Sequence, residues 1–150
     1  MRGYFGIGVY QAKTEANIGT LWRSAALYGA SFIFTIGHRY KGQASDTMKS
    51  QRHIPLMHFP SYEEFCMYMP CEAEILCVEL HEKAVVLPDL THPQQAIYLL
   101  GAEDDGLPEE ILQNKRIIQI PTLLPYSLNV AVAGTIIMYD RYSKSSEAKA

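Results

Sequence analysis

The sequence predicts an α/β fold with a mostly parallel sheet of six strands and helices on both faces. Apolar runs of strand length recur along the chain and alternate with helical patterns. Two of these runs, Ala96–Leu100 and Arg116–Ile120, stop at Gly101 and Pro121, which break regular structure. Strands that alternate with helices form parallel sheets, because each helix carries the chain back to the start of the next strand.

The first third of the chain holds two expected strands and one helix. Glycines in the strand Tyr4–Tyr10 allow another backbone to come close. Asn17 has the side chain of a helix cap, and a helix is expected from there to about Tyr28, where Gly29 supplies the stop. The second strand, Ser31–Ile36, is rich in phenylalanine and isoleucine.

The middle of the chain continues this alternation. The polar stretch His38–His53 is predicted to be a long loop, and the short strand Ile54–Phe59 follows it. A capping box at Ser61 opens a helix to about Met69, after which Glu74–Leu80 is the next strand.

The C-terminal part ends in a long helix, Leu128–Tyr142, which mixes small and apolar residues. Its apolar face fits a subunit interface and a buried core position equally well. The polar tail from about Ser143 to residue 150 is expected to fray.

Two adjacent loops, after Leu100 and after Ile120, are rich in glycine, proline and small polar residues. In open α/β sheets, ligands lie outside the carboxyl ends of the strands, in loops of this kind. We therefore predict a binding site there.

Composition limits the classes of protein. A chain of 150 residues with 48% apolar and 19% charged residues is typical of one globular domain. Its three cysteines form no CxxC pair, which indicates reduced thiols in a cytoplasmic protein rather than a disulfide framework or zinc site. No apolar run predicts a signal peptide or membrane span. The net charge of −3 means that a nucleic acid partner would need a local basic patch.

Gly6-Ile7-Gly8 begins a dinucleotide-binding fingerprint but does not complete it. Gln11 occupies the third glycine position, and the glycine pair lies inside a strand rather than at a strand-to-helix turn. A Rossmann cofactor site is therefore excluded. A small flavodoxin-like nucleotide-binding enzyme stays an alternative, since fold class alone does not decide function.

Three short motifs occur in order along the chain. Asn17–Arg23 reads N-x-G-x-x-x-R, Gly101–Gly106 reads G-x-E-x-x-G, and Ile120–Asn129 contains I-P, a short spacer and S-L-N. Each motif alone is weak evidence. Together they resemble the motifs of the SpoU/TrmH branch of the SPOUT RNA methyltransferases. The resemblance covers nearly the whole chain and suggests a minimal, single-domain member, residues 1–150.

The resemblance implies a deep trefoil knot in which the part from about Glu74 to Tyr142 threads through a loop and binds S-adenosylmethionine. It implies a homodimer built on the first and last helices, with active-site residues shared across the interface. The implied activity is methylation of a ribose 2′-hydroxyl in RNA, and we favour tRNA over rRNA because compact members often act on tRNA. A catalytically silent RNA- or cofactor-binding module on the same fold is the competing hypothesis.

For the cofactor, the resemblance points to strand ends and the loops after them. The matching positions are Glu79, Gly101, Ile120 and Leu128, and Leu100 lies beside them at a strand end. An apolar slot with exposed main-chain groups at these strand ends would suit an adenine ring.

Arg23 is the residue most directly tied to chemistry. It lies one helical turn beyond Gly19 and shares a face with it. The matching arginine of the family is described as activating the ribose hydroxyl. Because a guanidinium keeps its proton in proteins, we expect Arg23 to stabilise a developing alkoxide or an adjacent phosphate instead. Without the other motifs, a solvated helical arginine would be the simpler interpretation.

Four more residues are expected at the catalytic centre: Asn17, Glu103, Ser127 and Asn129. Asn17 either caps its helix alone or also orients Arg23, and Glu103 is expected to pair with Arg23 or Asn17. Ser127 is expected to cap the last helix with Asn129 in its first turn, and capping alone would explain both. Glu103 heads an acidic triplet, but no further carboxylates cluster nearby, so no metal site is expected.

Basic residues gather in the polar stretch after the second strand and form the best RNA-contact patch. They are Arg39, Lys41, Lys49 and Arg52, with His53 beside them. Lys13 adds to the patch from the first loop. A solvated loop is the alternative interpretation.

Overall fold

The computed structural model describes residues 3–41, 53–102 and 105–149. Its sheet has seven strands in the order β3-β2-β1-β6-β4-β7-β5, and every pair is parallel. The strands are β1 Tyr4–Tyr10, β2 Phe32–Ile36, β3 Leu56–Phe59, β4 Glu74–Val78, β5 Val85–Val86, β6 Gln95–Leu100 and β7 Arg116–Gln119. The predicted α/β class and parallel sheet are confirmed.

The number of strands corrects the prediction of six. The additional strand, β5, has only two residues and pairs with Ile118 and Gln119 of β7 at the edge of the sheet. A strand this short has no alternation of apolar and polar residues, so only its pairing reveals it.

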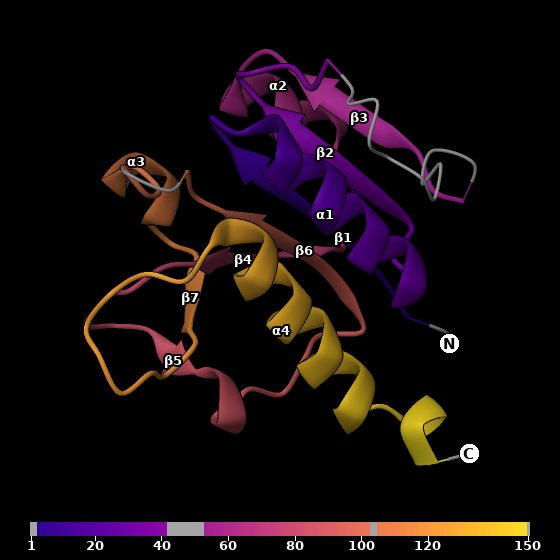
Figure 1. Ribbon diagram of the computed structural model, residues 1–150, viewed down its shortest axis with the longest axis vertical. Helices are drawn as coiled ribbons and strands as arrows, with labels where there is room; N and C mark the ends of the chain where they lie inside the picture. The colour runs from indigo at the N-terminus through magenta and orange to yellow at the C-terminus, as the bar shows by residue number, and fades with distance from the viewer. Residues whose placement is uncertain (1–2, 42–52, 103–104, 150) are drawn as a thin grey trace.

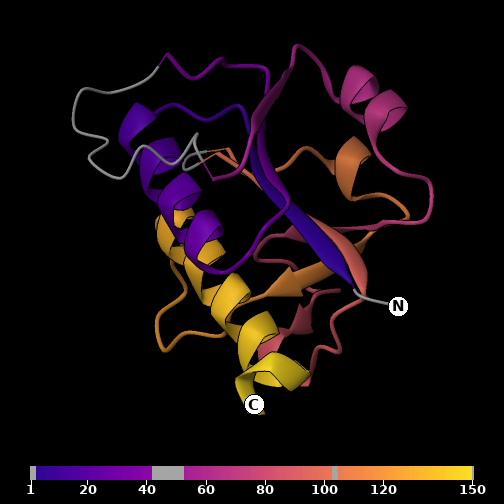
Figure 2. The ribbon, with the colours of Figure 1, turned by 90° about the vertical axis from the view of Figure 1, so that its right-hand side faces the viewer.

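Helices cover both faces of the sheet, as predicted (Figures 1 and 2). On one face, α1 and α4 pack over a core that includes Ile7, Leu21 and Ile137. On the other, α2 and α3 pack over a second core that includes Phe34 and Phe65. The helices are α1 Glu15–Leu27, α2 Tyr62–Tyr68, α3 Glu109–Leu112 and α4 Val130–Lys144, with short 3₁₀ helices at Leu87–Asp89 and Ser146–Lys149.

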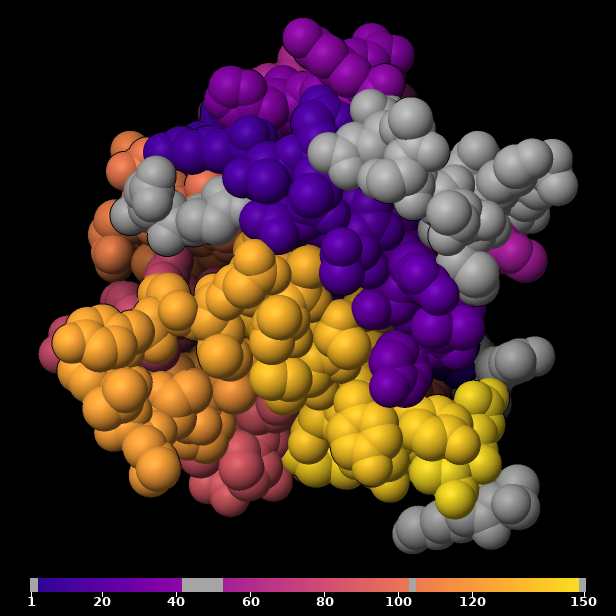
Figure 3. Space-filling model, viewed as in Figure 1, coloured from indigo at the N-terminus to yellow at the C-terminus, as the bar shows by residue number. Residues whose placement is uncertain are grey.

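Glycines, which have no side chain, allow close packing between neighbouring strands and between helices α1 and α4. A Cβ atom on Gly8 would lie 2.2 Å from the carbonyl oxygen of Phe34, so the close approach predicted for β1 is confirmed. A Cβ on Gly134 would lie 2.5 Å from Cδ1 of Leu21, so this glycine lets α4 approach α1. The result is a closely packed pair of helices, α1 and α4, whose surfaces meet in Figure 3.

The start of α1 differs from the prediction. Thr14 occupies the N-cap position and Asn17 lies inside the first turn, so Asn17 is not the helix cap. The end is as predicted: α1 stops at Leu27, and Gly29 has a positive φ of 79°. Asn17 is therefore available for a tertiary contact instead of a local one.

The start of α4 also differs from the prediction. Asn129, not Ser127, is the N-cap residue, and its side-chain oxygen accepts hydrogen bonds from the backbone N–H groups of Ala131 and Val132. Both residue types favour caps, and the chain takes up helical geometry only at Val130. At the other end, α4 runs to Lys144 and a 3₁₀ helix follows. The fraying expected from about Ser143 stays a prediction.

No helix in the described part of the chain is long and apolar enough to cross a membrane. The expected trefoil knot stays a prediction.

Candidate functional site

A cavity of about 370 Å³ opens where β4, β6 and β7 end. All five residues predicted at the cofactor site line it: Glu79, Leu100, Gly101, Ile120 and Leu128. Ser127 lines it as well. The structure thus brings together residues that lie up to 49 positions apart in the sequence (from 79 to 128), because parallel strands end at the same edge of a sheet.

Glu79 organises the loop that forms one wall of the cavity. One of its carboxylate oxygens accepts a hydrogen bond from the backbone N–H of Leu107 at 2.8 Å, and the other accepts one from Leu80 at 3.1 Å. The Glu79 carboxylate therefore holds protein backbone in this structure.

Two glycines make this arrangement possible. Gly106 has a positive φ of 63°, and a Cβ there would lie 2.4 Å from a Glu79 carboxylate oxygen. A Cβ on Gly101 would lie 2.5 Å from the backbone carbonyl carbon of Gly106. The loop folds back so closely on the end of β6 that neither position has room for a side chain.

The rest of the lining is suited to a flat, partly apolar ligand. Leu100, Ile120, Leu128 and Val130 supply apolar walls, while the strand ends expose main-chain groups. The volume lies within the range of about 300–1,000 Å³ that is common for small-molecule sites. The cavity residues therefore fit a nucleoside-sized cofactor.

Several lining residues were not anticipated, among them His81, Gln119 and Tyr126. The backbone N–H of His81 donates a hydrogen bond to the side chain of Gln119 at 3.2 Å, which ties the end of β4 to the end of β7. Gln119 directly precedes Ile120, and Tyr126 directly precedes Ser127. Including the residue before each predicted site residue would have found both.

Asn17 and Asn129 join the two helices beside the cavity. The Asn129 amide donates a hydrogen bond to the side-chain oxygen of Asn17 at 2.9 Å, across 112 positions of the sequence. Asn129 thus caps α4 and fastens it to the first turn of α1. The first and third sequence motifs meet at this bond.

Arg23 does not join this group. It is exposed on α1, six residues after Asn17, which is about 9 Å along a helix axis. It does not line the cavity, and among the described residues it makes no hydrogen bond or ion pair. The predicted pairing of Glu103 with Arg23 or Asn17 stays a prediction, because Glu103 lies outside the described residues.

The predicted RNA-contact residues are described only in part. Arg39 and Lys41 are exposed, in the segment that follows β2. The backbone N–H of Lys41 donates to both carboxylate oxygens of Glu15, at 3.1 and 2.9 Å. Lys49 and Arg52 lie outside the described residues.

The cysteines take no part in this site. All three are free thiols, as expected from the sequence. Cys77 is buried in β4, and burial raises its pKa to about 11, so the thiol stays protonated. Among the described residues, no group of His, Cys, Asp and Glu side chains is placed to hold a metal ion.

We compared the chain with known protein families, with proteins of curated function and with solved structures. The SpoU rRNA Methylase family profile matches residues 5–139. No protein of curated function matches the chain significantly. The structure of a protein described in terms of the 2-OH methylation of C/U34 on tRNA superposes with a TM-score of 0.81 at 25% identity, over 95% of this chain and 96% of that one.

Two more distant structures share the fold. The TrmH/SpoU tRNA modifying enzyme of A. aeolicus matches with a TM-score of 0.86 at 19% identity, over 99% of this chain and 78% of that one. The AdoMet-bound rRNA methyltransferase of Sinorhizobium meliloti matches with a TM-score of 0.83 at 23% identity. That match covers 94% of this chain but only 56% of the Sinorhizobium protein, so the chain spans about half its length.

Proposed function

Because the chain belongs to the SpoU rRNA methylase family, we propose that it transfers a methyl group from S-adenosylmethionine to a ribose 2′-hydroxyl of RNA. The observation that carries this proposal is the cavity at the ends of β4, β6 and β7, which gathers all five residues predicted at the cofactor site. We place this reaction in a single domain and, since the cysteines are free thiols, in the cytoplasm.

S-adenosylmethionine would supply the electrophilic methyl group, and the cavity would hold it by shape. Leu100, Ile120 and Leu128 would enclose the adenine ring, and exposed backbone groups at the strand ends would recognise its polar edge. Glu79 would act indirectly, by keeping the glycine loop closed against the end of β6.

Arg23 is assigned an electrostatic role. A guanidinium keeps its proton, so Arg23 would stabilise negative charge on the ribose oxygen or position a neighbouring phosphate. Asn17 and Asn129, bonded to each other, would fix the helix start beside the acceptor. Ser127, exposed at the cavity, would offer a hydroxyl to the substrate or the cofactor.

A second copy of the chain would complete the site. Tyr28, Tyr139 and Tyr142 form an aromatic group on the exposed face of α1 and α4, with ring centroids 6.3 and 6.2 Å from Tyr28. Leu27 and Val132 are also exposed on these helices, which lie side by side in Figure 3. A homodimer on this face would bury apolar surface and bring Arg23 of one protomer towards the cavity of the other.

Sedimentation velocity tests the dimer. A species of twice the chain mass at micromolar concentration is expected, and a monomer would contradict it.

We favour tRNA as substrate over rRNA. The support is the match at 25% identity, nearly full-length in both chains, to a protein described in terms of 2-OH methylation of C/U34 on tRNA. The match to the Sinorhizobium rRNA methyltransferase leaves nearly half of that larger protein uncovered.

The deciding experiment incubates the purified protein with methyl-labelled S-adenosylmethionine and, separately, total tRNA and rRNA. The RNA is then digested to nucleosides. Label on a ribose in the tRNA sample is expected. Label in rRNA only would correct the substrate, and label on a base would correct the acceptor. Cofactor binding without any transfer would favour a catalytically silent binding module.

A further inference from the structure

A second depression lies on the same edge of the sheet as the cavity. It has a volume of about 310 Å³ and opens between the β1–α1 connection and the segment that follows β2. It is lined by Ala12, Lys13, Thr14, Glu15, Ile18, His38, Arg39, Tyr40 and Lys41. In the sheet, β1 lies between β2 and β6, so this depression neighbours the cavity along the row of strand ends.

The floor of the depression is apolar and aromatic. Ala12 and Ile18 are buried there. The Tyr40 ring packs edge-on against Trp22, with centroids 5.9 Å apart and planes at 82°. Trp22 is itself fixed, because its indole N–H donates a hydrogen bond to the carbonyl of Ile54 at 3.1 Å. A held aromatic ring beside aliphatic side chains is a surface on which a nucleobase can stack.

The rim of the depression is basic. Lys13, Arg39 and Lys41 are exposed there, and among the described lining residues Glu15 alone carries a carboxylate. The chain as a whole carries a net charge of −3, so this cluster is a local exception. Cations around an apolar floor match the chemistry of a nucleotide, which has a flat base and an anionic phosphate.

One ion pair connects the depression to the cavity. Lys13, which lines the depression, has its Nζ atom 3.4 Å from a carboxylate oxygen of Asp105, which lines the cavity. Both side chains are largely exposed, at 44% and 81%, so the pair is weak. The ammonium of Lys13 thus lies at the boundary between the depression and the cavity.

We propose that this depression is a subsite for one unstacked nucleotide of the RNA substrate, next to the nucleotide that is methylated. The base stacks on Tyr40 and Ile18, and its phosphate contacts Lys13 and Arg39. The proposal rests on the proposed function for the identity of the ligand as RNA and for the position of the methylated nucleotide.

The first test locates a small probe by NMR. Cytidine 5′-monophosphate is titrated into ¹⁵N-labelled protein whose cavity is saturated with S-adenosylhomocysteine. Backbone signals of Ile18, Tyr40 and Lys41 are expected to shift. Shifts confined to cavity residues such as Gly101 and Leu128 would overturn the subsite.

The second test measures affinity for a fluorescein-labelled single-stranded RNA of ten nucleotides. If Lys13 and Arg39 each contact a phosphate, the Lys13→Ala/Arg39→Ala double variant lowers the slope of log Kd against log salt by about 1.4. Tyr40→Leu keeps bulk against Trp22 but removes the stacking surface, so binding should weaken about tenfold. Lys115→Ala, which alters a lysine at the opposite end of the sheet, is the matched control. Variants that bind like this control would overturn the proposal.

These outcomes separate the two proposals. Failure of the wild-type protein to bind S-adenosylmethionine or to transfer methyl would contradict the proposed function. The nucleotide titration, in contrast, measures binding at the depression and does not depend on methyl transfer. Normal methyl transfer together with unchanged RNA binding by the variants would contradict the subsite alone.

Discussion

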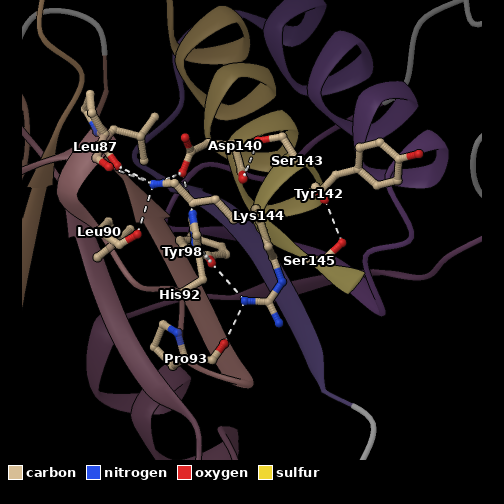
Figure 4. Close-up of polar contacts among 12 residues, drawn as sticks. Leu87, Leu90, His92, Pro93, Tyr98, Asp140, Tyr142, Ser143, Lys144 and Ser145 are labelled. Atoms are coloured by element: carbon tan, nitrogen blue, oxygen red, sulfur yellow. Dashed lines mark hydrogen bonds and ion pairs between the residues drawn. The ribbon is translucent and has the colours of Figure 1, made fainter. Parts of the chain in front are cut away.

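The two edges of the parallel sheet differ in how many polar side chains they leave exposed. At the carboxyl edge, Glu79 and Asn129 are hydrogen-bonded, but the cavity and the neighbouring depression also expose side chains such as Arg39, Lys41 and Ser127. At the amino edge, polar side chains are bonded to one another and to the backbone, as Figure 4 shows. The difference separates residues available to a ligand from residues that hold the fold.

The amino edge is built around His92, whose side chain is 6% exposed. One ring nitrogen lies 2.6 Å from the Tyr98 hydroxyl, and the other lies 2.7 Å from a carboxylate oxygen of Asp140. Asp140 also pairs with Lys144 at 2.9 Å. Buried polar groups with all their partners make a rigid local structure.

Two cations then fasten the end of α4 to the connection before β6. The Lys144 ammonium donates to the carbonyls of Leu87, Pro88 and Leu90 at 2.8, 3.2 and 3.0 Å. The Arg141 guanidinium donates to the carbonyls of Pro93 and Gln94 at 2.7 and 2.9 Å. This set of contacts, which we call the amino-edge network, holds the end of α4 against the connection before β6.

The largest expected effect concerns activity at the carboxyl edge. Arg23→Ala should lower kcat at least about 100-fold, as loss of one group that stabilises transition-state charge does. Its free energy of unfolding should change by less than about 0.5 kcal/mol, since Arg23 is exposed. Single-turnover methyl transfer and urea unfolding measure the two quantities.

Arg23→Lys is the matched control, because it keeps a positive charge and should retain part of the activity. Loss as complete as with alanine would contradict a purely electrostatic role and indicate that guanidinium geometry is required.

The next largest effect concerns stability at the amino edge. Asp140→Ala removes a partner from the buried His92 and from Lys144, and should lower the free energy of unfolding by about 2–3 kcal/mol. Asp105→Ala breaks an ion pair whose carboxylate is 81% exposed. This variant should change the free energy of unfolding by less than about 0.5 kcal/mol. Equal effects of the two variants in urea unfolding would refute the contrast between the edges.

A smaller effect is expected from two glycines at the carboxyl edge. A Cβ on Gly101 would lie 2.5 Å from the backbone of Gly106, so Gly101→Ala should displace the loop and weaken S-adenosylmethionine binding about tenfold. A Cβ on Gly19 meets only the Tyr40 hydroxyl at 3.6 Å, so Gly19→Ala should stabilise α1 by about 0.5–1 kcal/mol. Calorimetric titration and thermal unfolding give the two values. Undiminished cofactor affinity in Gly101→Ala would show that the loop adapts.

The smallest effect is a pH dependence of stability at the amino edge. Burial lowers the pKa of His92, against the opposing hydrogen bond and charge of Asp140. The unfolded chain, with an ordinary histidine pKa near 6.5, then binds more protons than the folded chain below that pH. Stability is therefore full above pH 6.5 and falls as the pH drops below it.

Urea unfolding at pH 7.5 and 5.5 measures this dependence, and His92→Gln should reduce it. Part of the dependence should remain in that variant, because burial also lowers the pKa of His58. An identical pH dependence in His92→Gln would rule out His92 as a contributor.

Much of the fold could be read from local patterns. The apolar runs predicted the strands, and Gly29 predicted the end of α1. The strand ends predicted which residues would line the cavity, because parallel strands share an edge wherever they stand in the sheet. The two-residue strand β5 was not predicted, because it has too few residues to show any periodicity.

The sequence by itself determined the α/β class and the parallel sheet, because these follow from hydrophobic period and chain breaks. The five cavity residues came from its resemblance to a known family, together with the strand ends at which they lie. Only the tertiary structure decided that Asn129 caps α4 and bonds Asn17, that Glu79 holds a loop, and that His92 lies in a buried network. The reason is physical: a polar side chain takes the partner that folding brings within about 3 Å, and its neighbours in the sequence do not specify that partner.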